Sequence, residues 1–118
     1  MKTRKELKED YKQHSAPMGV FRIKNNANNK IFIGSSNDLN AIWNRQRMQL
    51  KTGAHPNKEL QADWRKFGED TFTYEIVAEL EKDDEKKLDH TRELKALEEM
   101  YLEELNPYGK NGYNKKTD

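Results

Sequence analysis

The chain has 118 residues, of which 33% are hydrophobic and 36% charged, and it contains no cysteine. No apolar run approaches the roughly 18 residues that a membrane span needs, and without cysteine there is neither a disulfide scaffold nor a cysteine-ligated metal site. The charged N-terminus lacks the apolar stretch of a signal peptide, so we expect a small cytoplasmic protein with no membrane partner.

Charge is distributed unevenly along the chain, although the net charge is only +1. Residues 14–78 carry nine basic and six acidic side chains, whereas residues 79–104 carry five basic and eleven acidic ones. A modestly basic body beside an acidic segment permits a nucleic-acid partner without requiring one. A protein partner that binds the acidic segment is the alternative.

The N-terminal part of the chain predicts a helix followed by a β-hairpin. Residues 1–17 form a helical extension with little apolar surface. Residues 19–23 and 30–34 are rich in β-branched and aromatic side chains, which is typical of strands. The asparagines at 25–29 indicate the turn between them, because asparagine tolerates left-handed backbone.

A helix from about Asp38 to Lys51 follows the hairpin, and we expect Ser36 or Asn37 to cap its N-terminus. Gly53 ends this helix, since glycine adopts the left-handed conformation that commonly closes a helix.

A shorter helix comes next, with Pro56 in its first turn and Gly68 at its end. Residues 71–80 alternate like a strand, and residues 91–105 give the strongest helical pattern in the chain. The order β-β-α-α-β-α predicts an α+β fold with a small three-stranded antiparallel sheet flanked by helices. We expect this domain to span residues 18–118.

One acidic residue, Glu98, interrupts the apolar stripe of the last helix. At about 100° per residue it projects about 40° from Leu94, among the apolar side chains of that face. A carboxylate there costs free energy unless it is paired, hydrated or bound to a cation. Glu98 is therefore either a core-edge side chain that reaches a lysine or a backbone amide, or a ligand for Mg²⁺, which often takes one or two carboxylates. The stripe consists of Leu94, Leu97, Tyr101, Leu102 and Leu105.

Motifs along most of the chain resemble the GIY-YIG nuclease family. That resemblance implies an α+β fold and cleavage of DNA phosphodiester bonds with one divalent metal, Mg²⁺ or Mn²⁺. The resembling segments are, in chain order, Gly19-Val20-Phe21, Phe32-Ile33-Gly34-Ser35-Ser36, Trp43, Leu60-Gln61, Trp64, residues 66–72, residues 105–108 and residues 111–114.

The resemblance implies that four positions of the family's active site are substituted. Its two motif tyrosines fall on Phe21 and Phe32, its catalytic arginine falls on Ile42, and a histidine one turn later falls on Gln46. Hydrolysis of a phosphodiester requires a group that activates water and a cation where negative charge develops. These four side chains provide neither.

Three functional positions are retained under the same resemblance. The metal-binding glutamate falls on Glu98, which the helical projection singles out independently. A second catalytic histidine falls on His55, and an asparagine falls on Asn114, which we group with the substrate-binding residues Arg45, Arg47 and Lys51.

The sequence therefore predicts a nucleic-acid-associated domain of this family with weak or absent nuclease activity. One alternative is an active Mg²⁺- or Mn²⁺-dependent endonuclease in which Glu98 and His55 are joined by a displaced Arg45, one turn from Ile42. A second is a protein-interaction module that uses the acidic stretch 79–104 or the N-terminal helix.

Overall fold

The computed structural model describes residues 17–80 and 90–116. The helical extension predicted for residues 1–17 therefore lies, apart from its last residue, outside the described residues. Within the described ranges, no helix is both long and apolar enough to cross a membrane.

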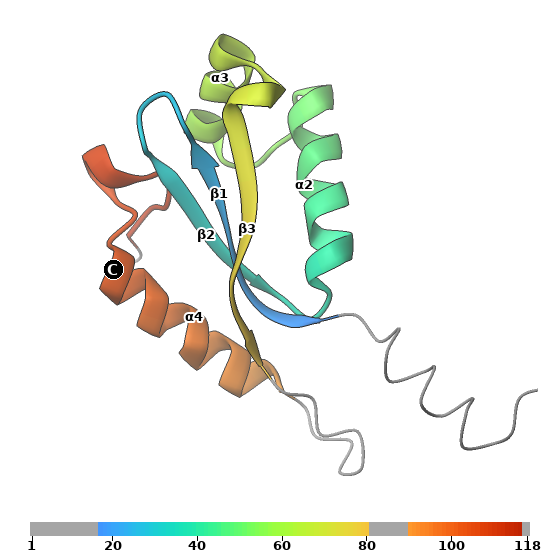
Figure 1. The fold of residues 1–118 in the computed structure, drawn as a ribbon, viewed down its shortest axis with the longest axis vertical. Helices are drawn as coiled ribbons and strands as arrows, with labels where there is room; N and C mark the ends of the chain where they lie inside the picture. The colour runs from blue at the N-terminus through green and yellow to red at the C-terminus, as the bar shows by residue number, and fades with distance from the viewer. Residues whose placement is uncertain (1–16, 81–89, 117–118) are drawn as a thin grey trace, which may run out of the picture.

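Three antiparallel strands form the centre of the fold, in the order β2-β1-β3. The strands are β1 (Met18–Asn25), β2 (Ile31–Ser36) and β3 (Phe72–Leu80). Helices α2 (Leu39–Thr52) and α3 (Lys58–Phe67) lie on one side of this sheet, and α4 (Thr91–Leu105) lies on the other (Figure 1). The predicted fold class and element order are confirmed.

The alternation of side chains along β1 and β2 divides the core between the two faces of the sheet. Toward α2 and α3, Phe21 and Ile23 pack in a buried cluster that includes Leu39, Leu50, Leu60, Trp64, Phe72 and Tyr113. Toward α4, the smaller cluster of Val20, Ile31 and Ile33 is covered by Leu97, Tyr101, Leu102 and Leu105. The apolar stripe predicted on the last helix therefore faces the sheet.

Helix α2 begins one residue later than predicted and with a different cap. The Asp38 carboxylate accepts a hydrogen bond from the N–H of Ala41 at 2.9 Å, so Asp38 is the N-cap. Ser36 and Asn37 are not caps, because Ser36 still belongs to β2 and its hydroxyl bonds the backbone of Asp38. Gly53 ends the helix in the left-handed conformation, with φ of 80°, as predicted.

Helix α3 begins at Lys58, so the prediction that Pro56 lies in its first turn is wrong. Asn57 is the N-cap, and its side-chain oxygen accepts from the N–H of Leu60 at 2.9 Å. A side-chain acceptor at this position satisfies a free helix N–H, which Pro56 has no group to do.

The C-terminal tail lies along the outer edge of β2. Gly112 forms a parallel bridge with Ile31, and the N–H of Tyr113 donates to the carbonyl of Ile31 at 2.9 Å. The phenol of Tyr113 donates to Asp63 of α3 at 2.7 Å and accepts from the amide of Asn25 at 3.1 Å. Because Tyr113 is only 1% exposed, these bonds hold the tail firmly against the sheet.

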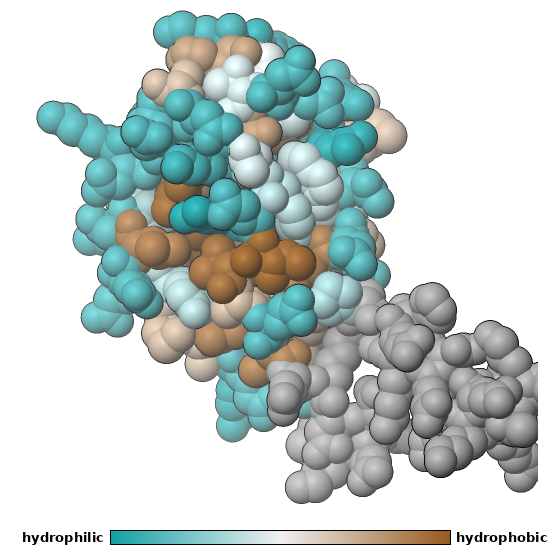
Figure 2. All heavy atoms as spheres, viewed as in Figure 1, coloured by the Kyte–Doolittle hydropathy of each residue, from teal (hydrophilic) through white to brown (hydrophobic). Residues whose placement is uncertain are grey.

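The opposite edge of the sheet, formed by β3, is more exposed. Figure 2 shows a hydrophobic band where the middle of β3 runs between α2 and α4, with hydrophilic surface around it. Ile76, in the middle of this strand, is 40% exposed. The candidate residues Glu98, His55, Gln46 and Asn114 lie instead near β2, the other edge strand.

Candidate functional site

The carboxylate of Glu98 lies against β2. Its Oε2 accepts a hydrogen bond from the hydroxyl of Ser35 at 2.9 Å, and the Glu98 side chain is half-buried. Ser35 faces α4 because it alternates with Gly34 along β2, in phase with Ile31 and Ile33. The partner of Glu98 is therefore a serine hydroxyl rather than the lysine or backbone amide of the core-edge interpretation, and the interpretation as a metal ligand stays open.

The Glu98 carboxylate is the main candidate metal ligand beside β2. Within residues 17–80 and 90–116, no group of three or more histidine, aspartate or glutamate side chains could hold a metal ion. Mg²⁺ often binds through one or two protein carboxylates and keeps several waters. Glu98, with the Ser35 hydroxyl beside it, fits such a sparse site.

The ring of Phe21, a residue of the central strand β1, lies over Gly34 of the neighbouring strand β2. Phe21 pairs with Gly34, and a Cβ placed on Gly34 would lie only 2.6 Å from Cζ of the Phe21 ring. The absence of a side chain at Gly34 therefore lets the ring lie flat across the strand, where it is 2% exposed. Phe21 contributes packing and has no group that can exchange a proton.

His55 and Gln46 form a hydrogen-bonded pair between α2 and the loop that precedes α3. The N–H of Asn57 donates to Nδ1 of His55 at 3.0 Å, so the ring proton lies on Nε2, which donates to Oε1 of Gln46. His55 is 6% exposed, and burial lowers the pKa of its imidazole below the usual 6.5. His55 is therefore a neutral side chain with both ring nitrogens engaged.

A hollow of about 300 Å³ opens beside this pair. Phe32 contributes an apolar wall, and its ring meets that of His55 edge-on at 5.8 Å and 83°. Of the predicted site residues, the structure brings together Phe32, Gln46, His55 and Asn114 here. Glu98 is not among the lining residues; it lies on the α4 face of β2, where Ser35 points.

The side chain of Asn114 is used by the backbone of β2. Its Oδ1 accepts from the N–H of Ile33 and its Nδ2 donates to the carbonyl of Ile33, both at 2.8 Å. The amide thus continues the hydrogen bonding of the sheet beyond its edge strand. Asn114 has a structural role that its position in the sequence does not reveal.

Two of the three cationic residues predicted to bind substrate lie away from the hollow. Arg47 and Lys51 approach Glu69 at 3.7 and 3.6 Å, and the Arg47 guanidinium lies 5.7 Å from the ring of Trp43. Trp43 stacks on Tyr74 of β3, so this group occupies the β3 side of α2.

Arg45 is the predicted cation that lies on the opposite side of α2 from Arg47. It is exposed, and it projects about 200° around the helix from Arg47. Sequence reasoning missed Lys115, which lines the hollow directly after Asn114, and also Ser35. The alternation of Ile31, Ile33 and Ser35 is the signal that places Ser35 on the face covered by the last helix.

The model of the GIY-YIG catalytic domain matches residues 17–114. The chain is 35% identical over 96 residues to intron-associated endonuclease 1 of Enterobacteria phage T4, an alignment that covers 81% of this chain and 36% of that protein. The chain thus spans about a third of the length of this curated relative.

Two solved structures share the fold. The catalytic domain of the homing endonuclease I-TevI superposes with a TM-score of 0.69 at 30% identity, over 85% of this chain and 99% of that one. The E75A mutant of the I-TevI catalytic domain gives a TM-score of 0.68 at 30% identity, over 83% and 92% of the two chains.

Proposed function

The chain belongs to the GIY-YIG family, and from that membership we propose that it binds nucleic acid while its phosphodiester-cleavage activity is weak or absent. The observation that carries this proposal is the packing of Phe21, Phe32 and Ile42, where the family resemblance expects two tyrosines and an arginine. All three pack in or against the same hydrophobic core cluster and carry no polar group.

A metal ion held by Glu98 would polarise a phosphoryl oxygen, but hydrolysis needs more than this. A group must also take the proton of the attacking water, and His55 is poorly suited because Nδ1 accepts the N–H of Asn57 and Nε2 carries the proton. A cation must stabilise the developing charge, and Ile42 supplies hydrocarbon instead.

The expected loss of rate is large. Removal of one electrostatic donor commonly lowers the rate by about 10²–10³, and loss of acid–base catalysis lowers it by about 10²–10⁴. Such effects are not additive within one site, yet either alone is severe. We therefore expect cleavage far below that of a family member with a complete site.

Nucleic-acid binding is supported by the nature of the relatives and by two exposed cations, Arg45 and Lys115. The matched proteins are named as endonucleases, one of them a homing endonuclease. Arg45 and Lys115 have no acidic partner within the described ranges, in contrast to Lys30, which pairs with Glu59 at 2.7 Å. Unpaired cations on the surface can neutralise backbone phosphates.

An active enzyme is the second candidate, and the position of Arg45 favours it. Its exposed guanidinium projects about 60° from Ile42 on the helix, so it would supply the cation that the family resemblance expects at position 42. Mg²⁺ or Mn²⁺ would be the metal in that case.

Two assays on the whole chain test the proposal. Duplex binding should be measurable at low salt and should weaken steeply as the salt concentration rises, because phosphate contacts release counterions. Nicking of supercoiled plasmid with Mg²⁺ or Mn²⁺ should not exceed that of Glu98→Ala. Metal-dependent nicking that disappears in Glu98→Ala would establish the active enzyme instead, and absence of binding at low salt would favour a protein-interaction module.

A further inference from the structure

The hollow beside β2 has walls of different chemistry. Its volume of about 300 Å³ lies at the lower end of the roughly 300–1,000 Å³ typical of small-ligand pockets. Phe32 provides an aromatic wall, Gln46 an amide, and Lys115 an ammonium group. A ligand that uses all three has a flat apolar part, a hydrogen-bonding edge and a negative charge.

The hydrogen bonds around the hollow determine which polar groups are left for a ligand. The amide of Asn114 is bonded to Ile33, and the amide of Asn57 donates to the carbonyl of Tyr113 at 2.7 Å while its oxygen caps α3. Both amides are therefore held in place through oxygen and nitrogen, and each has one N–H left over.

Gln46 differs from these two amides. Its Oε1 accepts from His55, which fixes the orientation of the carboxamide, and its NH₂ group has no partner within residues 17–80 and 90–116. The Lys115 ammonium likewise has no acidic partner there. Gln46 and Lys115 therefore both present donors to the hollow, so a ligand must present acceptors to them.

The aromatic wall suits a planar ligand. Phe32 is only partly buried, and its ring lines the hollow without any hydroxyl group to bind water. Proteins bind unstacked nucleobases by stacking them on such rings, and every base has the required flat face. Base carbonyls and ring nitrogens also supply the acceptors that Gln46 requires.

We infer that this hollow binds one unpaired nucleotide of a single-stranded nucleic acid. The base lies against Phe32 and accepts from the NH₂ of Gln46, and the adjoining phosphate lies beside Lys115. The inference rests on the proposed nucleic-acid binding and adds a preference to it. A duplex keeps its bases paired and stacked, so it cannot place one in the hollow without the cost of extruding it.

The test compares two forms of one oligonucleotide. A fluorescently labelled ten-nucleotide strand of mixed sequence, alone and annealed to its complement, is titrated with the full chain at low salt. We expect tighter binding of the single strand. Gln46→Glu keeps an oxygen for His55 but replaces the free donor with an acceptor, and it should weaken single-strand binding about tenfold.

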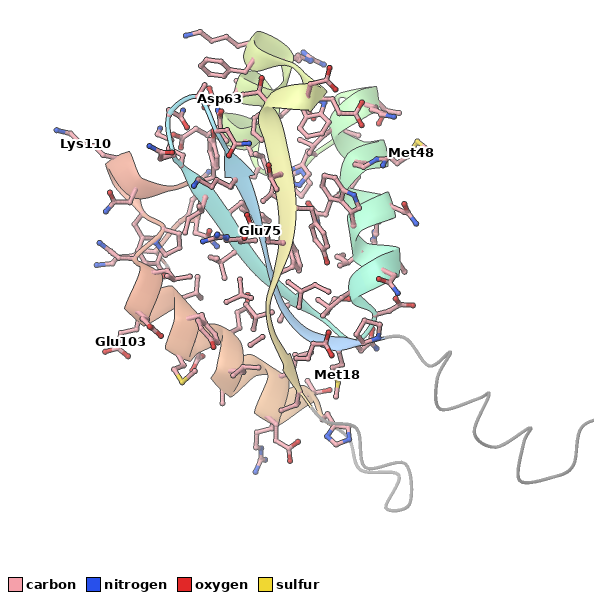
Figure 3. All side chains as sticks on the ribbon, viewed as in Figure 1. Met18, Met48, Asp63, Glu75, Glu103 and Lys110 are labelled. Carbon is pink, nitrogen blue, oxygen red and sulfur yellow. The ribbon has the colours of Figure 1, made fainter. Side chains whose placement is uncertain are left out.

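Matched variants separate the hollow from general charge effects. Gln49→Glu adds the same charge on α2 outside the lining residues and should weaken both forms equally and only slightly. Lys115→Gln should weaken single-strand binding more than Lys110→Gln, since Lys110 points away from the sheet (Figure 3). Lys115 is exposed, so this pair remains informative if Gln46→Glu does not fold.

The outcomes distinguish failure of the proposed nucleotide site from failure of the proposed nucleic-acid binding. If both forms bind equally, with Gln46→Glu like Gln49→Glu and Lys115→Gln like Lys110→Gln, the nucleotide site is overturned and the proposed binding function stands. If neither form binds at low salt, the proposed function fails and the nucleotide site fails with it.

Discussion

The phenol of Tyr113 ties the tail to the body of the domain, so Tyr113→Phe should destabilise the protein. The hydroxyl donates to Asp63 at 2.7 Å and accepts from the Asn25 amide at 3.1 Å. Asp63 lies near the end of the sheet where the β1–β2 turn is found (Figure 3). The substitution removes one oxygen and leaves the aromatic packing intact.

The magnitude follows from what remains after the oxygen is removed. Asn25 is 0% exposed, so its amide loses an acceptor in a place that water does not reach. Asp63 is half-buried and keeps a bond from Asn28 at 3.2 Å, so its loss is smaller. An unsatisfied buried group costs about 1–3 kcal/mol, and we expect a loss of about 2 kcal/mol, or a Tm lower by about 8 °C.

Urea and thermal unfolding, followed by circular dichroism, measure this loss. Tyr108→Phe is the matched control, because the Tyr108 hydroxyl has no hydrogen-bond partner in the part of the chain that the structure describes. It should change the free energy of unfolding by less than about 0.5 kcal/mol. Equal stability of the two variants would refute the role assigned to the buried phenol.

Three further predictions concern the titration and packing of the fold. Burial raises the pKa of Tyr74 and of Tyr113 to about 12, compared with about 10 in the unfolded chain. The free energy of unfolding should therefore be constant below about pH 10 and fall between pH 10 and pH 12, by up to about 1.4 kcal/mol per pH unit for each phenol. Urea unfolding across this pH range, compared with the Tyr74→Phe and Tyr113→Phe variants, measures the fall. Burial lowers the pKa of His55, so the midpoint of its NMR titration should lie below 6.5. The free energy of unfolding that the neutral imidazole contributes is lost as the pH falls below 6.5. A titration midpoint at or above 6.5 would contradict this prediction. Gly34→Ala should lower the free energy of unfolding by about 1–3 kcal/mol, because the added Cβ would lie 2.6 Å from the Phe21 ring. In a double-mutant cycle, the same substitution should cost less when Phe21→Leu is already present. Additive losses of unfolding free energy would argue against the contact.

The fold was largely predictable because local patterns and tertiary contacts agree. The apolar stripe of α4 predicts the helix from Thr91 to Leu105 as observed. The cap of α2 was not predictable, because Ser36 and Asp38 are both good caps by residue type. The choice depends on how far β2 extends, and pairing of Ser36 with Gly19 keeps it in the strand.

The site was less predictable, since it depends on contacts between residues far apart in the chain. Residue type indicated Glu98, but its partner Ser35 lies 63 residues away. The sequence does not reveal that Arg47 and Lys51 lie beside Glu69, because the turn after α3 brings Glu69 to them only in the folded chain. The role of Asn114 follows only from the tail that Tyr113 anchors along β2.

The most direct test of the account is the plasmid-nicking rate of a variant that restores the substituted positions. With Mg²⁺ or Mn²⁺, the unaltered chain should nick no faster than Glu98→Ala, whereas the restored variant should regain metal-dependent nicking. A restored variant that folds, by its unfolding transition, and stays inert with either metal would contradict the account. The restored variant carries Phe21→Tyr, Phe32→Tyr, Ile42→Arg and Gln46→His.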